Sequence, residues 1–331
     1  MPLFEYGEFG YACRHVPSLP VCNLFLSSLL RTQPSSSYPY LLNLPDPASN
    51  GTFGEILAHQ GVGVRSRCAI ARASTFGGSQ DDLGNLANII FAALSILLAL
   101  VLIHKAKRRQ AAVGRIEITV FFALYGLQCL LQIVTLGSIV GQGTAAVVVL
   151  TALHLATVVA MFFVLTWTGL LGLQLVDDGT AASLIPMSLG SLIAFVGTLY
   201  ISLDKGLRIT AFFEDRSIHP GRLKELFLFT LTIVWPLIAT VVYFATSLGV
   251  TILVLREGRP ALIFLAALLT FVLSQGIYYG LSEMICLRSG AKVDGSFLAT
   301  FLESVTIVLI YLGWSGITED EWDEYALSPA T

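Results

Sequence analysis

Residues 83–103 read LGNLANIIFAALSILLALVLI, and the basic stretch HKAKRRQ follows at residues 104–110. The 21-residue run carries no charged side chain. A membrane-spanning helix needs about 20 mostly apolar residues, because the hydrocarbon core of a bilayer is about 30 Å thick. The run therefore predicts a transmembrane helix with a basic flank.

Six further apolar segments of comparable length follow this one. They occupy residues 116–139, 145–175, 181–203, 226–255, 261–282 and 296–314. Helices are the expected form, since backbone polar groups in lipid must be satisfied within their own segment. The sequence predicts an all-α, polytopic membrane helix bundle with about seven transmembrane helices.

The composition supports this interpretation. Of the 331 residues, 55% are hydrophobic and only 12% are charged, whereas soluble domains carry roughly 25% charged residues. The net charge of −3 gives no reason to expect nucleic acid as a partner. Three regions follow: a loop-rich N-terminal region without helical periodicity (1–82), the seven-helix domain (83–314) and an acidic tail (315–331).

The basic cluster after the first span sets the expected orientation. Its members are Lys105, Lys107, Arg108, Arg109 and Arg115, and basic loops favour the cytosol. Over all short loops the Lys and Arg count is seven on each side, so the expectation depends on the first span, which usually dominates. No cleavable signal peptide is evident. We expect a lumenal N-terminus and a cytosolic C-terminus.

Four of the five cysteines lie on the expected lumenal side. They are Cys13, Cys22, Cys68 and Cys286, while Cys129 lies within a span. Four thiols in an oxidising compartment allow three pairings, and the sequence does not choose between them. In the same region, Asn50-Gly51-Thr52 is an N-glycosylation acceptor triplet, which makes Asn50 a candidate site.

Short motifs occur along the chain from about residue 9 to residue 325. They are Phe9-Gly10 with Cys13, Leu19-Pro20-Val21-Cys22, Arg67-Cys68-Ala69-Ile70-Ala71-Arg72, Gly84-Asn85, Gly114-Arg115-Ile116-Glu117, Asp177-Asp178-Gly179-Thr180, Ile285-Cys286, Asp294-Gly295, Trp314 and Thr318-Glu319-Asp320-Glu321. In this order and spacing the chain resembles the fungal chitin synthase export chaperones. Residues 16–18, 28–60 and 63–66 depart from the family pattern, as does Ile70, so a paralogue with a different client is an alternative.

The resemblance implies a multi-pass protein of the endoplasmic reticulum membrane. Its implied function is that of a dedicated chaperone that binds the transmembrane region of a chitin synthase and assists folding and export. A chitin synthase and membrane lipid are then the expected partners. No cofactor, metal or catalytic residue is expected, because HExxH, CxxC, P-loop and GxSxG motifs are absent from the sequence.

Few ionisable residues lie within the predicted spans. His154 and Glu303 are the deepest, while Glu117 and Glu283 lie near span ends, where both are expected to reach headgroup water. Intramembrane ionisable residues are functional candidates, because an unpaired acid at mid-helix costs at least ~2.5 kcal/mol. His154 and Glu303 are expected to pair across the bundle, to relay protons, or to serve packing and partner recognition.

Two acidic stretches have simpler interpretations. Asp177 and Asp178 are expected to form a solvated turn with an Asp N-cap before the next span. The tail residues Glu319, Asp320, Glu321 and Trp322 form either a solvated terminus or a docking peptide for vesicle-coat cargo adaptors.

Glycine pairs in several spans offer close-approach surfaces for other helices. They are Gly169/Gly172, Gly190/Gly197 and Gly276/Gly280. Two other functions share the predicted topology. A heptahelical receptor is disfavoured because the third span ends in LVDD and the seventh lacks Asn-Pro-x-x-Tyr. A small-molecule transporter is disfavoured because Pro186 and Pro236 do not form a convincing pair of broken helices in two repeated halves.

Overall fold

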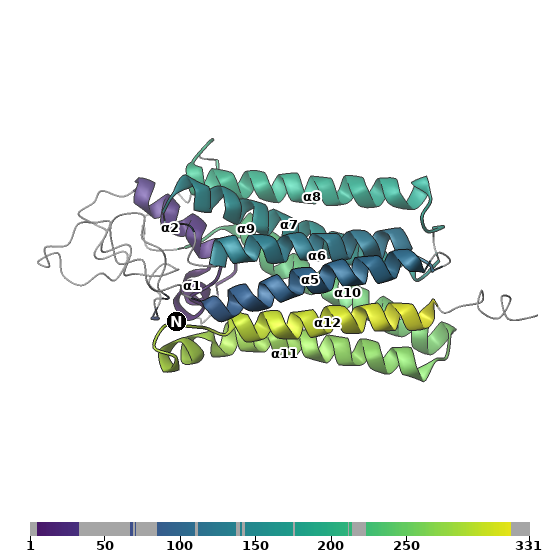
Figure 1. The fold of residues 1–331 in the computed structure, drawn as a ribbon. Coiled ribbons are helices and arrows are strands. Elements are labelled where there is room, and N and C mark those ends of the chain that lie inside the picture. The colour runs from purple at the N-terminus through teal and green to yellow at the C-terminus, as the bar shows by residue number, and fades with distance from the viewer. Residues whose placement is uncertain are drawn as a thin grey trace, which may run out of the picture.

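The computed structural model describes residues 5–32, 67, 68, 70, 85–109, 112–136, 140, 143–174, 176–210, 212–213 and 223–318. These residues contain seven helical segments long and apolar enough to cross a membrane, and no named strand; an isolated bridge joins Glu8 to Lys224. The segments run side by side along one axis (Figure 1). The predicted all-α bundle with seven spans is confirmed.

Six spans are single helices. They are α5 (Leu86–Arg108), α6 (Arg115–Leu136), α7 (Ala145–Leu171), α8 (Ala181–Leu207), α11 (Gly258–Arg288) and α12 (Ser296–Ile317). Helix α11 continues six residues beyond the predicted end at 282, so Glu283 and Cys286 lie in the helix and not after it. The predicted span was shorter because polar and charged residues end an apolar run. They do not end a helix, which can continue beyond the hydrocarbon layer.

The fifth span is built from four consecutive helical pieces. They are α9 (Leu226–Phe229), the π-helix η2 (Thr230–Val234), α10 (Trp235–Gly249) and a second π-helix, η3 (Val250–Val254). Pro236 lies at the start of α10. Proline has no N–H, so it cannot donate to the carbonyl one turn earlier. The wider π turn just before it accommodates this interruption.

Helix α7 forms the centre of the bundle. In its most apolar window 72% of the residues are buried, against 11% for α8 and 22% for α11. Close packing places Gly169 of α7 against Tyr243 of α10, where an added Cβ would lie 3.1 Å from the Tyr243 Cα. Helices α8 and α11 lie at opposite edges of the bundle in Figure 1 and expose long apolar faces.

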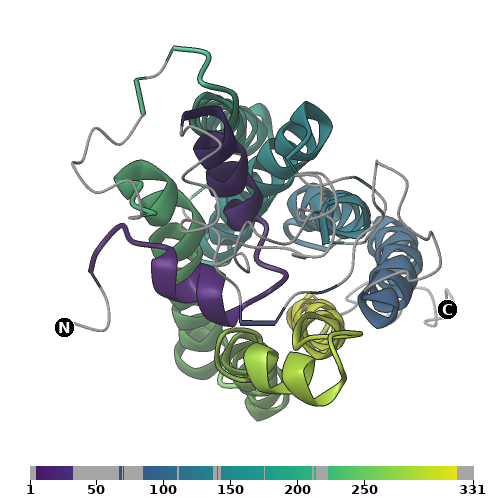
Figure 2. The ribbon, with the colours of Figure 1, turned by 90° about the vertical axis from the view of Figure 1, so that its left-hand side faces the viewer.

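Two short helices, α1 (Gly10–His15) and α2 (Val21–Thr32), lie across one end of the bundle (Figure 2). Because the sequence of this region lacks helical periodicity, it predicted loops, and the two helices are a correction. Phe9, Cys13 and Leu24 are fully buried and cluster with Val148 of α7 and Leu228 of α9. Docking on the bundle therefore stabilises these helices, which are too short to be stable alone.

Candidate functional site

The residues of two predicted motifs meet at the end of the bundle that carries the basic cluster. The Asp178 carboxylate accepts a hydrogen bond from the Gly114 amide at 2.8 Å. In the opposite direction, the Glu117 carboxylate accepts from the Gly179 amide at 3.1 Å and from the Ser183 hydroxyl at 2.7 Å. Each motif thus supplies an acid that binds the backbone of the other motif.

This arrangement corrects two expectations. Asp177 and Asp178 were expected to form a solvated turn with an Asp N-cap. The turn is exposed at Asp177 and Gly179, but Asp178 binds the amide just before α6 and does not cap α8. The N-cap of α8 is Thr180, which makes no capping bond with its side chain. Glu117 was expected near headgroup water, but its residue is fully buried. Negative groups at the start of α6 also interact favourably with the helix dipole.

The last span closes the same end. Trp314 of α12 donates its indole N–H to the Val113 carbonyl at 2.8 Å, and Arg109 donates to the Ser315 carbonyl at 3.1 Å. Arg115 starts α6 beside this junction. We call Gly114, Glu117, Asp178, Gly179 and Ser183 the motif junction. The motif junction fixes the connection between α5 and α6 against the α7–α8 connection, and the bonds of Trp314 and Arg109 fix the same connection against α12.

Two disulfides lie at the opposite end. Cys13 pairs with Cys22, which closes the connection between α1 and α2. Cys68 pairs with Cys286 on α11, across 218 positions of sequence. Cys129 is a free, buried thiol within α6. Of the three pairings that the sequence allowed, the structure contains this one.

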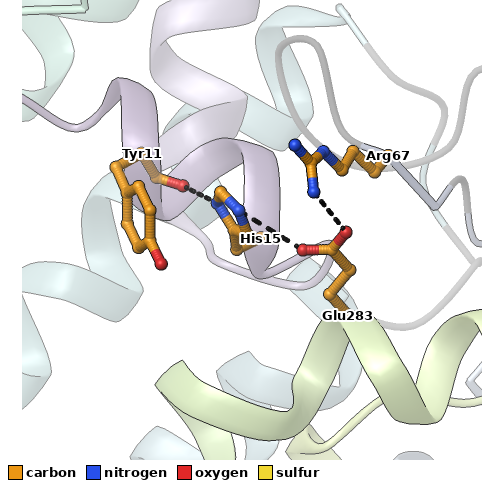
Figure 3. A network of polar contacts seen from close by, with 4 residues as sticks. All are labelled: Tyr11, His15, Arg67 and Glu283. Carbon is orange, nitrogen blue, oxygen red and sulfur yellow. Dashed lines mark hydrogen bonds and ion pairs between the residues drawn. The ribbon is translucent and has the colours of Figure 1, made fainter. Parts of the chain in front are cut away.

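A charged cluster, drawn in Figure 3, contains Arg67, which precedes Cys68, and Glu283, which lies three residues before Cys286. Arg67 donates to Glu283 Oε1 at 3.1 Å, and His15 Nε2 lies 3.4 Å from Glu283 Oε2. The other ring nitrogen of His15 lies 2.9 Å from the Tyr11 carbonyl oxygen. Glu283 therefore joins α1, the Cys68 segment and α11, and it has partners on two sides.

Asp294 holds the connection between α11 and α12. Its Oδ1 accepts from the Ser296 amide at 3.1 Å and from Asn85 Nδ2 at 3.5 Å. The Asn85 amide in turn donates to the Lys292 carbonyl at 2.9 Å. Burial raises the pKa of the Asp294 carboxyl, although the hydrogen bonds from Ser296 oppose this effect. The Asp294 motif thus connects the start of the first span to the start of the last.

The two deep ionisable groups have separate partners. His154 Nδ1 lies 2.9 Å from the Thr135 hydroxyl oxygen. Glu303 Oε1 accepts a hydrogen bond from Gln275 Nε2 at 2.9 Å. They do not pair directly, but both line one interior cavity of about 140 Å³.

Sequence reasoning missed an uncharged polar cluster in the spans. Gln132 of α6 donates to Asn88 of α5 at 3.0 Å and to Thr300 of α12 at 2.6 Å. All three side chains are buried. Interhelical hydrogen bonds of this kind hold membrane helices together. The signal available in the sequence was an amide side chain in an otherwise apolar span.

The predicted glycine pairs divide into two groups. A Cβ at Gly169 or Gly190 would overlap side chains of the bundle, and one at Gly172 would lie 3.2 Å from the Gly169 carbonyl oxygen, so these three glycines serve internal packing. Gly197, Gly276 and Gly280 have nothing within 4 Å of that position. They therefore remain open on the outside of α8 and α11.

Some predicted residues lie outside the described part of the chain. They are Asn50, the acidic residues Glu319, Asp320 and Glu321, and Trp322. Within the residues that the structure describes, no group of three His, Cys, Asp or Glu side chains could hold a metal ion.

Comparison with known proteins agrees with the order of these motifs. The family model described as "Chitin synthase export chaperone" matches residues 5–327. The chain belongs to the chitin synthase export chaperone family. The matched range includes the residues of both ends of the bundle, the motif junction and the disulfide region.

Curated members of this family align over most of their length. A chitin synthase export chaperone of Chaetomium globosum is 27% identical over 96% of this chain and 83% of its own length. One of Candida glabrata is 25% identical over 95% and 94%, and one of Saccharomyces cerevisiae is 24% identical over 96% and 93%. No solved structure shows a significant match to this chain.

Proposed function

We propose that this protein is a membrane chaperone of the endoplasmic reticulum that binds the transmembrane region of a chitin synthase and assists its folding and export. The observation that carries the proposal is the family match over residues 5–327, together with relatives named for chitin synthase export. Seven apolar spans are consistent with this role, because a partner for membrane helices must itself lie in the membrane.

The proposed client contact is the outer face of α11. Gly276 and Gly280 lie one turn apart, both are exposed, and no atom lies within 4 Å of an added Cβ at either. Leu273 and Val272 flank them with more than half of their surface exposed. Two small residues at this spacing let a second helix approach closely, and close approach is what drives helix association in lipid.

Helix α8 provides the matched comparison. It is even less buried than α11, but Gly190 is covered by the Phe163 ring, which leaves only Gly197 open among its paired glycines. A lone open glycine forms no groove. Substitution with leucine at Gly276 and Gly280, or at Gly197, adds bulk where the folded chain has room for it.

The contact is tested by co-purification of a chitin synthase with the full-length protein in mild detergent. We expect Gly276→Leu with Gly280→Leu to lower the recovered synthase several-fold, roughly the effect of 1 kcal/mol or more. Gly197→Leu should leave recovery unchanged. Equal recovery with the parent protein, the α11 double variant and Gly197→Leu would show that α11 is not the contact. Lower recovery with Gly197→Leu alone would assign the contact to α8.

The export function is tested in cells. Deletion of the gene should strand a chitin synthase in the endoplasmic reticulum while other membrane cargo leaves. Normal export of every chitin synthase after deletion would reject the proposal. A G protein recovered in place of a synthase would favour a receptor, and solute flux in liposomes would favour a transporter.

The proposed orientation has the N-terminus in the lumen and the C-terminus in the cytosol. Both disulfides lie at one end of the bundle, and disulfides form in oxidising compartments. Lys105, Lys107 and Arg108 lie at the other end, in the last turn of α5. Protease protection of tags at either terminus in sealed microsomes tests this orientation.

The acidic tail is proposed to bind a vesicle-coat cargo adaptor. Helix α12 ends at Ile317, so a chain that stops after Thr318 keeps all seven spans. We expect this truncation to slow exit of the protein from the endoplasmic reticulum without lowering its stability. Unchanged exit in a vesicle budding assay would assign the tail no such function.

A further inference from the structure

Two adjoining, partly open cavities lie between the helices of the bundle. One has a volume of about 140 Å³ and the other about 180 Å³. They share five lining residues, namely Gln128, Val158, Thr232, Tyr279 and Glu303. Together they reach the lower end of the size range of small-molecule pockets, which begins at roughly 300 Å³.

Glu303 lies where the two cavities meet. Its one hydrogen bond from the described residues comes from the neutral amide of Gln275. No Lys or Arg side chain is among the described residues that line either cavity, and His154 is the one basic group there. An ionised carboxylate without a counter-charge is costly inside a membrane span, so this position favours a cation.

The two cavities differ in chemistry. The larger one is lined by rings from four helices, including Tyr125, Phe162, Phe244 and Phe271. The smaller one carries polar groups, including Gln132, His154 and Thr300. Aromatic faces bind apolar groups and also attract cations. The larger cavity is therefore mostly apolar and lined by rings, and the Glu303 carboxyl lies where it meets the smaller cavity.

Two irregular parts of the fold border this space. The π-helix η2 and the start of α10 contribute Thr232, Ile233 and Pro236 to the walls. Single π-helical turns occur frequently at functional sites. At the far end, Phe9 and Leu19 from the N-terminal region line the smaller cavity, so that region covers it. A ligand there would be held between the spans and the docked N-terminal helices.

We propose that this space binds a small organic amine, with its ammonium group at Glu303 and its apolar part among the rings of the larger cavity. This site is inside the bundle, whereas the client contact proposed above is on the outer face of α11. The inference therefore does not depend on the proposed function. A benzene-sized group is appropriate in size, since a cavity of about 150 Å³ holds benzene.

The test uses full-length protein in phosphatidylcholine nanodiscs and 2-phenylethylamine as the probe, followed by saturation-transfer NMR. 2-Phenylethanol and phenylacetate are the neutral and anionic comparisons of the same shape. We expect saturable binding of the amine that is about tenfold or more tighter than that of the alcohol, which corresponds to about 1.4 kcal/mol or more. Phenylacetate should not bind.

Two variants locate the site. Glu303→Gln keeps the size of the side chain and removes its charge, so amine affinity should fall to that of the alcohol. Glu257→Gln, at the exposed N-cap of α11, is the matched control and should bind the amine like the parent protein. Equal affinity for amine and alcohol, absence of saturable amine binding, or full affinity in Glu303→Gln would each overturn the proposal. If Glu303→Gln does not fold, the comparison of the three probes on the parent protein decides.

Discussion

Glu117 on α6 accepts a hydrogen bond at 3.1 Å from the backbone amide of Gly179, which lies 62 positions later in the chain. Asp178, next to Gly179, accepts a hydrogen bond from the Gly114 amide, which lies three residues before Glu117. The two connections at this end of the bundle therefore hold each other reciprocally. Gly114 and Gly179 both have positive φ, 68° and 66°, which explains why glycine occupies each turn.

Loss of one acid should destabilise the motif junction. Asp178→Ala removes the acceptor for the Gly114 amide, and we expect the free energy of unfolding to fall by about 1–3 kcal/mol. Thermal unfolding of the purified protein in detergent measures the change. Asp177→Ala is the matched control, because the neighbouring Asp177 is exposed, and it should unfold like the parent protein.

The reciprocal arrangement makes a second, sharper prediction. Glu117→Ala should cost a similar amount, but the double variant should cost less than the sum, because either change already loosens the contact between the same two connections. If the losses of unfolding free energy in the two single variants add up to the loss in the double variant, the two bonds act independently. Such a result would contradict a single junction.

The spans were predictable because lipid imposes a simple length and composition on each of them. The contacts within the motif junction were not predictable from the sequence. Pairs such as Glu117 with Gly179 depend on which helix ends meet, and no local period in the sequence encodes that neighbourhood. The motifs marked the right residues, Gly114 to Glu117 and Asp177 to Gly179, yet the expected Asp N-cap was wrong, because Asp178 binds the Gly114 amide and the N-cap of α8 is Thr180.

The N-terminal helices illustrate a second limit of sequence reasoning. Helices α1 and α2 are stabilised by contacts with distant parts of the chain, such as the Phe9 amide with the Leu223 carbonyl at 2.8 Å. Gln132 with Asn88 illustrates a third limit, because uncharged amides in spans are common and only their convergence makes a cluster. Tertiary contacts decide all of these features.

Asp294 should make stability depend on pH. Burial raises its pKa above the unfolded value of about 3.9, so the folded protein holds the proton more tightly. Its favourable contribution is therefore complete below the unfolded pKa and is lost as pH rises through the folded pKa. Asp294→Asn does not titrate, so its melting temperature should rise relative to the parent protein between pH 4 and neutral pH.

Thermal scans across this pH range, with Asp177→Asn as the exposed control, measure the difference. The control should track the parent protein at every pH. A gap between Asp294→Asn and the parent protein that does not change with pH would show that the folded and unfolded pKa values of Asp294 are equal.

The disulfide between Cys68 and Cys286 should anchor the N-terminal segment to α11. Cys286→Ser removes it, and we expect a loss of about 2–4 kcal/mol, as for other native disulfides. Cys68→Ser should have the same effect, and the double variant should add nothing. Alkylation followed by non-reducing and reducing gels tests the pairing directly. Full labelling of all four thiols without reductant would contradict both bonds, while Cys129→Ser should change neither mobility nor pairing.

Two glycines on α8, seven positions apart, should respond oppositely to the same substitution. A methyl group at Gly190 would overlap the Phe163 ring of α7, so Gly190→Ala should destabilise the protein by about 1–3 kcal/mol, as overpacking does. Gly197 has open space, and there Gly197→Ala should stabilise the helix by roughly 0.5–1 kcal/mol, because alanine loses less backbone entropy than glycine. Unfolding of both variants under one set of detergent conditions provides the comparison. Equal effects at the two positions would mean that α8 does not contact α7 in the register described here.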